Sequence, residues 1–316
     1  MKKILVILTG GTIGCDISEN IINISEKSCK GIVDLYNEKY NNDSCFDVVN
    51  PFISLSENIN NKKIGIIMQT IKDNLCKNYD GIIVTHGSDT LSFTSNIASV
   101  IFDNSQIPIV FIASNKALSD EMGNGMTNFR NAVLVIETSC EKGVLVSYSN
   151  SIDDNTIYDA GNFCEADCFD DSFSSYDKTV YGKIVDEKFV RISNKIFQNN
   201  NKIKDVDFNF EKEVLLIKPY PGMNYENFNL DFTGAVVHYL YHSSTACIEE
   251  GRCSVIEFIK KCREKQIPFY IAPLKRKNET MYSSLEKILK GDNVKAFFDC
   301  SIEKAYAEAL VEINSK

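Results

Sequence analysis

The sequence lacks three features that mark common classes of protein. None of its eleven cysteines form a CxxC pair, so neither a zinc pattern nor a compact disulfide scaffold is indicated. No apolar run approaches the roughly 20 residues of a membrane helix, and the first, residues 4–8, is also too short for a signal peptide. A net charge of −9 argues against binding to nucleic acid phosphates. We therefore expect a soluble cytoplasmic protein with free thiols that binds neither nucleic acid nor membrane.

Histidine is also scarce, and no metal site is expected. His238 and His242 are four residues apart with no third ligand nearby, which argues against zinc and makes a structural role the simpler interpretation. Residues 153–177 carry a run of carboxylates that is compatible with a bound cation, but they lack the spacing of a calcium loop. A solvated loop is the alternative that we favour, and we expect no cofactor.

Short β-branched runs alternate with helical patterns along the 316 residues, and this alternation indicates an α/β fold. We expect a large N-terminal domain, residues 1–195, with a parallel-rich sheet covered by helices. The polar segment 196–212 is the best candidate for a linker. A smaller C-terminal α/β domain, residues 213–316, completes the prediction.

The first stretch with chemical content is a buried strand at residues 4–8 that leads directly into Gly10, Gly11 and Thr12. Glycines at a strand end allow a sharp turn and the close approach of a ligand. A hydroxyl presented there stands at the carboxyl edge of a parallel sheet, where open α/β folds bind ligands. The alternative is a tight turn that happens to contain a threonine.

A second stretch repeats this design about seventy residues later. The strand at residues 81–85 ends in a turn that contains His86, Ser88 and Asp89. If the two strands are neighbours, Thr12 faces Ser88 and Asp89 across one crevice. A hydroxyl needs a nearby base or relay to lose its proton, so this combination suits a nucleophile. His86 would help to shape the turn.

Both motifs together resemble the signatures of the bacterial-type L-asparaginase (asparaginase/glutaminase) family. The similarity lies in residues 9–14 (TGGTIG) and 84–91 (VTHGSDTL), which follow in the family's order and spacing. Nearly the whole chain is similar to the family. Further similar segments are residues 55–59 (LSENI), 128–133 (NFRNAV), 221–222 (PG) and 241–246 (YHSSTA).

The resemblance implies hydrolysis of the side-chain amide of asparagine, and sometimes of glutamine, to the acid and ammonia. Thr12 would be the nucleophile that attacks the amide carbon. Ser88 stands where the family has a second threonine, which relays a proton or activates water. Asp89 would hold the α-amino group of the substrate or belong to the proton relay.

The resemblance also implies how an amino acid substrate would be bound. Ser56 and Glu57 would contact its α-carboxylate and α-amino ends. Backbone amides around Gly11, Ser88 and Ser114 would stabilise the oxyanion. The family forms dimers or dimers of dimers, so a homodimer or homotetramer is expected, with each site closed by the second domain of a neighbouring subunit.

Three departures from the family pattern bear on activity. Ser88 replaces a threonine but keeps the hydroxyl. The segment after Thr12, which is either a mobile flap or a surface loop, lacks the family's flap tyrosine, because Tyr36 and Tyr40 come too late. The family's catalytic lysine corresponds to Ala160, and no lysine occurs between Lys142 and Lys178. Losing one member of a relay can remove most of the rate enhancement.

These observations leave three hypotheses open. The chain is an active L-asparaginase-like amidohydrolase in which another group, such as Lys116 or Lys142, replaces the missing lysine. Alternatively it is a catalytically impaired homologue that binds an amino acid or a protein partner. In the third hypothesis the hydrolase chemistry persists on another amide, which the altered segment 153–177 suggests.

Overall fold

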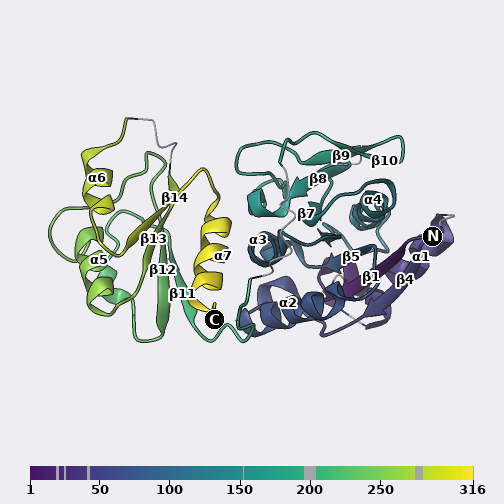
Figure 1. Cartoon of the computed structure of the whole chain (residues 1–316), viewed down its shortest axis with the longest axis horizontal. Helices are drawn as coiled ribbons and strands as arrows, with labels where there is room; N and C mark the ends of the chain where they lie inside the picture. The colour runs from purple at the N-terminus through teal and green to yellow at the C-terminus, as the bar shows by residue number, and fades with distance from the viewer. Residues whose placement is uncertain are drawn as a thin grey trace. The chain divides into compact units, whose positions relative to one another are not determined.

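The computed structural model describes residues 1–18, 21–24, 26–40, 43–151, 153–195, 204–274 and 280–315. It contains two compact units, Met1–Asn209 and Phe210–Lys316 (Figure 1). Part of the predicted linker, residues 196–203, lies outside the described residues, so the predicted domain limits stay a prediction.

Within the described residues, unit 1 has an eight-stranded sheet in the order β10-β9-β8-β7-β6-β5-β1-β4. Strands β4, β1, β5, β6 and β7 run parallel, and β8, β9 and β10 continue the sheet antiparallel. The strands are β1 (Lys3–Leu8), β4 (Cys45–Val49), β5 (Gly81–Thr85), β6 (Pro108–Ile112), β7 (Gly143–Ser147), β8 (Thr156–Asp159), β9 (Gly182–Val185) and β10 (Lys188–Arg191).

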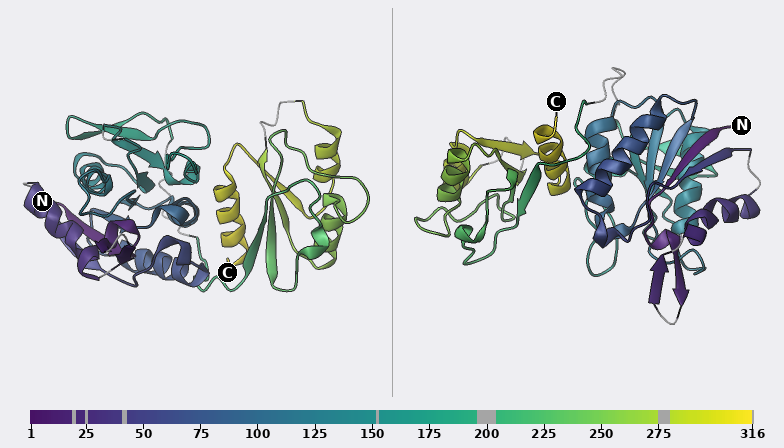
Figure 2. Two further views of the ribbon diagram at one scale, coloured as in Figure 1. Left: turned by 180° about the vertical axis from the view of Figure 1, so that it is seen from behind. Right: turned by 90° about the horizontal axis from the view of Figure 1, so that it is seen from below.

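Helices cover both faces of this sheet, which explains why its central strands β5, β6 and β7 are buried throughout (Figures 1 and 2). Helices α1 and α4 pack on the face that carries Ile83, Val110 and Leu145. Helix α3 contacts β6 and β7 on the other face. The helices of the unit are α1 (Glu26–Lys39), α2 (Asn61–Leu75), α3 (Leu91–Phe102) and α4 (Gly125–Thr138). The predicted α/β fold with a parallel-rich sheet is confirmed.

Short elements are where the sequence prediction was wrong. The sequence predicts a short strand and turn at residues 51–59, but within that range Ser54 makes a single bridge to Gly10, and the strand of this region is β4, residues 45–49. The acidic segment 153–177 contains β8, whose alternating pattern is too short to stand out among carboxylates. After Thr12 the chain forms a hairpin of β2 (Cys15–Ser18) and β3 (Ile21–Ile24), which projects from the unit (Figure 2).

Unit 2 contains a parallel sheet in the order β11-β12-β13-β14. Helix α7 packs on β11, β12 and β13, and it buries Ala305, Ala309 and Leu310 at the helical spacing that the sequence shows. The elements are β11 (Glu213–Ile217), β12 (Thr233–Tyr239), β13 (Phe269–Leu274), β14 (Val294–Phe298), α5 (Val255–Glu264), α6 (Ser283–Leu289) and α7 (Ile302–Ile313). None of the helices in the described ranges combines the length and apolarity needed to cross a bilayer.

Candidate functional site

The two motif turns lie side by side because β1 and β5 are neighbouring parallel strands. Leu8 is paired with Thr85, so both strands end at the same level. A pair of hydrogen bonds then joins the ends of the two strands. Thr9 Oγ1 donates to the Thr85 carbonyl (2.6 Å), and Thr9 N–H donates to Thr85 Oγ1 (3.2 Å). All four groups are buried, which makes the spacing of the turns that follow rigid.

Two glycines bring the turns into backbone contact. Gly11 has φ +77°, and a Cβ there would lie 2.4 Å from the Gly87 nitrogen. A Cβ on Gly87 would lie 2.5 Å from the Ser56 Cβ. The Gly11 amide donates to the Ser54 carbonyl (3.0 Å), so that N–H is engaged within the fold. The structure therefore gives Gly11 a role in close packing of the turns.

A third loop brings Ser56 to Asp89. Ser56 is 5% exposed, and its Oγ donates to Asp89 Oδ2 at 2.6 Å. Thr90 Oγ1 donates back to the Ser56 carbonyl at 3.0 Å. Glu57 follows on the 3₁₀ turn η2 (Ser56–Asn58), where its side chain is exposed. The Asp89 carboxylate is thus held at one edge of the site by the hydroxyl of Ser56, which comes from the loop after β4.

Both candidate hydroxyl residues open a 3₁₀ turn at the carboxyl edge of the sheet. Thr12 begins η1 (Thr12–Gly14), Ser88 begins η3 (Ser88–Thr90), and both residues are half-buried. The two turns come from adjacent strands, as the sequence motifs require. This arrangement offers a nucleophile, a second hydroxyl and a carboxylate along one sheet edge.

Ser114 lies next to these turns but uses its hydroxyl within its own loop. Its Oγ donates to the Lys116 carbonyl at 2.5 Å, and the residue is 1% exposed. A Cβ on Gly125, the first residue of α4, would lie 2.7 Å from Ser114 Oγ and 3.3 Å from Ile13 Cγ1. Ser114 is therefore close to the Thr12 turn, where its side chain supports the loop.

Ala160, which the sequence resemblance aligns with the family's catalytic lysine, is fully buried and begins the turn η4 (Ala160–Asn162). The two lysines considered from the sequence as replacements have partners elsewhere. Lys116 pairs with Asp120 (3.3 Å), and Lys142 donates to Gln106 (2.7 Å) just before the amino end of β7. Lys142 is thus at the edge of the sheet opposite the motif turns.

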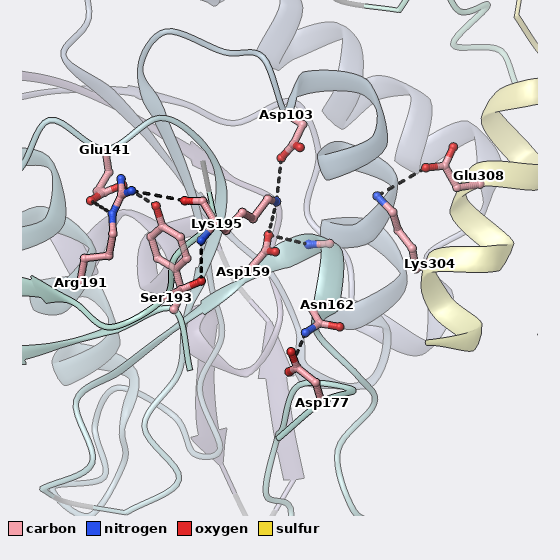
Figure 3. Close-up of polar contacts among 12 residues, drawn as sticks. Asp103, Glu141, Asp159, Asn162, Asp177, Arg191, Ser193, Lys195, Lys304 and Glu308 are labelled. Carbon is pink, nitrogen blue, oxygen red and sulfur yellow. Dashed lines mark hydrogen bonds and ion pairs between the residues drawn. The ribbon is translucent and has the colours of Figure 1, made fainter. Parts of the chain in front are cut away.

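Lys195, which sequence reasoning did not single out, lies beside Ala160, because it pairs with the preceding residue Asp159. Its Nζ is 2.8 Å from Asp159 Oδ1 and 3.2 Å from Asp103 Oδ1 (Figure 3). Asp103 caps the carboxyl end of α3, whereas Ser88 precedes the other end of that helix. At 1.5 Å per residue these ends are about 20 Å apart, so Lys195 binds at the end of α3 opposite Ser88.

Next to Lys195 a second charged cluster fixes the β9–β10 end of the sheet. Glu141 is 7% exposed and accepts hydrogen bonds from Tyr181 and from both Nε and Nη2 of Arg191 (Figure 3). Burial and this carboxylate raise the pKa of Tyr181. The arrangement is structural: Arg191 compensates a carboxylate that would otherwise be buried without a counter-charge.

His86 is wholly buried directly behind the second turn. Its Nδ1 lies 2.8 Å from the Gly87 carbonyl oxygen, and its ring contacts Phe111. Burial lowers the pKa of His86 to about 4, against a partial opposing effect of the Gly87 hydrogen bond. The imidazole is therefore neutral in the folded protein at neutral pH.

This burial predicts an acid-sensitive fold. The folded pKa lies below the unfolded value of about 6.5, so on acidification the unfolded chain is protonated first and stability falls between pH 6.5 and 4. His86 contributes a loss of about 3 kcal/mol across that window, and His238, whose pKa burial also lowers to about 4, adds a loss of similar size. Denaturant unfolding at several pH values will show the combined loss, and His86→Asn should remove about half of it. An unchanged pH dependence in His86→Asn would contradict this assignment.

A family model for the N-terminal domain of asparaginases matches residues 3–196, more than half of the chain. The chain belongs to the asparaginase family. The matched range contains all the candidate site residues, from Gly11 to Ser114.

Curated relatives of this asparaginase-family chain include two archaeal proteins, each a subunit of glutamyl-tRNA(Gln) amidotransferase. The one from Methanococcus vannielii is 29% identical over 180 residues, which cover 54% of this chain and 42% of that protein. The one from Methanosphaera stadtmanae is 26% identical over 275 residues, covering 82% and 60%. The chain thus spans about half the length of these relatives.

Solved L-asparaginases share the fold over almost the whole asparaginase-family chain. The thermostable enzyme from Thermococcus kodakarensis superposes with a TM-score of 0.81 at 18% identity, covering 99% of this chain and 93% of that one. L-asparaginase I from Vibrio cholerae gives 0.78 at 21% identity, covering 97% and 91%. At these identities the likeness establishes the fold.

Proposed function

We propose that this protein hydrolyses the side-chain amide of L-asparagine, or of a closely related small amide, to the acid and ammonia. The observation that carries the proposal is the contact between the two motif turns. The backbones of Gly11 and Gly87 meet without side chains, which brings together the turns that carry Thr12, Ser88 and Asp89. The names of the relatives and of the solved neighbours both denote amide chemistry, amidotransferase and asparaginase.

In this proposal the Thr12 hydroxyl attacks the amide carbon and forms an ester. The proton of the Thr12 hydroxyl passes by way of the Ser88 hydroxyl to the departing nitrogen, which leaves as ammonia. Water then hydrolyses the ester, releases the carboxylic acid and returns the proton to Thr12. Ser56 and Asp89, joined at 2.6 Å, and the exposed Glu57 would bind the charged ends of the amino acid. No cofactor or metal takes part in these steps.

A second candidate function is binding without turnover, and Ala160 favours it. This residue is buried where the family has a lysine, and Lys116 and Lys142 are engaged with other residues. A relay that lacks its base loses most of its rate. The protein would then sense an amino acid or bind a partner through an intact pocket.

Ammonia release from a panel of amides separates these possibilities. The panel contains L-asparagine, L-glutamine and a dipeptide that carries an asparagine side chain, with each compound at millimolar concentration. Release from L-asparagine supports the proposal, and release only from the dipeptide assigns a modified amide as substrate. A thermal shift with L-aspartate but no release from any amide supports binding alone.

Lysine at position 160 tests whether the missing base limits the rate. Helix α3 packs on η4, the turn that contains position 160. Two oxygen atoms of this helix, Ser92 Oγ and Asn96 Oδ1, have no hydrogen-bond partner among the described residues and are acceptors for a lysine ammonium. We expect Ala160→Lys to raise ammonia release at least about tenfold. Ala160→Met is the matched control, since both variants share an overpacking cost of about 1–3 kcal/mol. Equal rates in the two variants would show that a lysine there does not matter.

The assembly and location remain part of the proposal. A homodimer or homotetramer in the cytoplasm agrees with the family resemblance. Light scattering of the purified full chain measures the oligomeric state directly, and a monomer that turns over amides would contradict a site completed by a neighbour.

A further inference from the structure

The proposed mechanism gives no role to His86, although this residue lies within the second motif. Its side chain is wholly buried, and its backbone N–H donates to the Ile112 carbonyl of β6 at 2.8 Å. The residue is therefore fixed by the neighbouring strand before the chain reaches Gly87. The one polar contact of its ring is with the carbonyl oxygen of Gly87, at 2.8 Å, among the described residues.

This contact defines the protonated nitrogen of the ring. A carbonyl oxygen can only accept a hydrogen bond, so Nδ1 carries the proton and donates it. Nε2 is then an acceptor, and it has no partner among the described residues. Because burial keeps the imidazole neutral, the ring has one donor, and that donor is used on Gly87.

Holding the Gly87 carbonyl also orients the next amide. In a planar trans peptide the C=O and the following N–H point in opposite directions. The Gly87 carbonyl points to the buried His86 ring, so the Ser88 N–H points away from that ring. Gly87 has φ −89° and ψ 151°, an ordinary extended conformation that a glycine leaves easily. A fixed partner for its carbonyl therefore matters.

We infer that His86 is a positioning residue whose Nδ1–H, by holding the Gly87 carbonyl, keeps the Ser88 N–H aimed at the oxyanion that forms on the amide substrate. This inference rests on the proposed function, since the oxyanion belongs to amide hydrolysis. Preorganised backbone donors contribute strongly to such reactions because they need no reorientation during the step.

Two substitutions of similar size isolate the hydrogen bond. In His86→Asn the side-chain Nδ2 occupies about the place of imidazole Nδ1 and can still donate to Gly87. In His86→Leu the branching is the same, but the donor is lost. Both variants remove the ring and leave a similar unfilled space. A difference in activity between them therefore measures the effect of the hydrogen-bond donor to Gly87. Thermal unfolding of each confirms that it folds.

We expect His86→Asn to keep kcat for L-asparagine within about fivefold, and His86→Leu to lose about 10²-fold. KM should stay within about twofold in both, because the oxyanion contact is made in the transition state. A merely structural role would instead lower kcat equally in the two variants. Equal kcat in His86→Asn and His86→Leu would overturn the inference.

A spectroscopic arm reads the peptide itself, independently of turnover. Gly87–Ser88 is the one Gly–Ser step in the sequence, so labelling with [1-¹³C]glycine and [¹⁵N]serine gives a single correlation peak. Loss of the hydrogen bond should move the Gly87 carbonyl carbon upfield in His86→Leu but not in His86→Asn. L-Aspartate should shift the Ser88 amide in wild type and His86→Asn only.

The two arms separate the inference from the proposed function. If the wild type releases no ammonia from any amide, the proposed function fails, and the carbonyl resonance still shows whether His86 holds this peptide. If turnover is present but the peak is the same in wild type and His86→Leu, the positioning role is wrong.

Discussion

Replacing Thr12 by alanine is expected to lower ammonia release from L-asparagine by at least about 10⁴-fold, as removal of a nucleophile does in other hydrolases that form a covalent intermediate. Thr12 is half-buried at the start of η1, so loss of its γ-substituents should change the unfolding temperature little. Steady-state ammonia release with equal amounts of folded protein measures the effect.

Thr12→Ser is the matched variant, because it keeps the hydroxyl and removes the methyl group. We expect it to retain activity within about tenfold of wild type. If Thr12→Ala and wild type release ammonia at the same rate, Thr12 is not the nucleophile. If Thr12→Ser is as inactive as Thr12→Ala, the hydroxyl alone does not account for the role of this residue.

Gly11→Ala should have the second largest effect, through the geometry of the site. An added Cβ would lie 2.4–2.5 Å from backbone atoms of His86 and Gly87, which cannot move aside as a flexible side chain does. The two turns must separate, and a displacement of about 1 Å costs about 10²-fold in rate. The positive φ of +77° adds strain of about 1–2 kcal/mol.

Gly222→Ala separates these two causes. Gly222 has φ +80°, and no heavy atom lies within 4 Å of its added Cβ, so this variant carries the backbone strain without the collision. We expect Gly222→Ala to lose stability and keep its activity, whereas Gly11→Ala loses both. The measurements are thermal unfolding and kcat. An active Gly11→Ala protein would show that close contact of the turns is not required.

The long elements and the proximity of the two motifs could be predicted from the sequence. Residues 4–8 are apolar throughout and residues 82–84 continue the pattern in the second strand, which is typical of strands covered on both faces. Parallel neighbours of this kind place the turns that follow them together. For residues 91–102 the sequence predicts a helix, and this range agrees with α3. These signals are local and extend over many residues, so they survive tertiary packing.

Contacts between distant segments could not be predicted. The hydrogen bond from Ser56 to Asp89 depends on the path of the loop after β4, a strand that the sequence analysis missed. Lys195 reaches Asp103 and Asp159 through an antiparallel extension whose short strands carry no distinctive pattern. The engagement of the Gly11 amide by Ser54 likewise depends on a single bridge.

The buried alanine at position 160 makes turnover the central question, and ammonia release from millimolar L-asparagine by the purified full chain answers it most directly. The account predicts release that is absent in Thr12→Ala. A folded wild-type protein that L-aspartate stabilises, but that releases no more ammonia than Thr12→Ala, would contradict it and assign the pocket to binding alone.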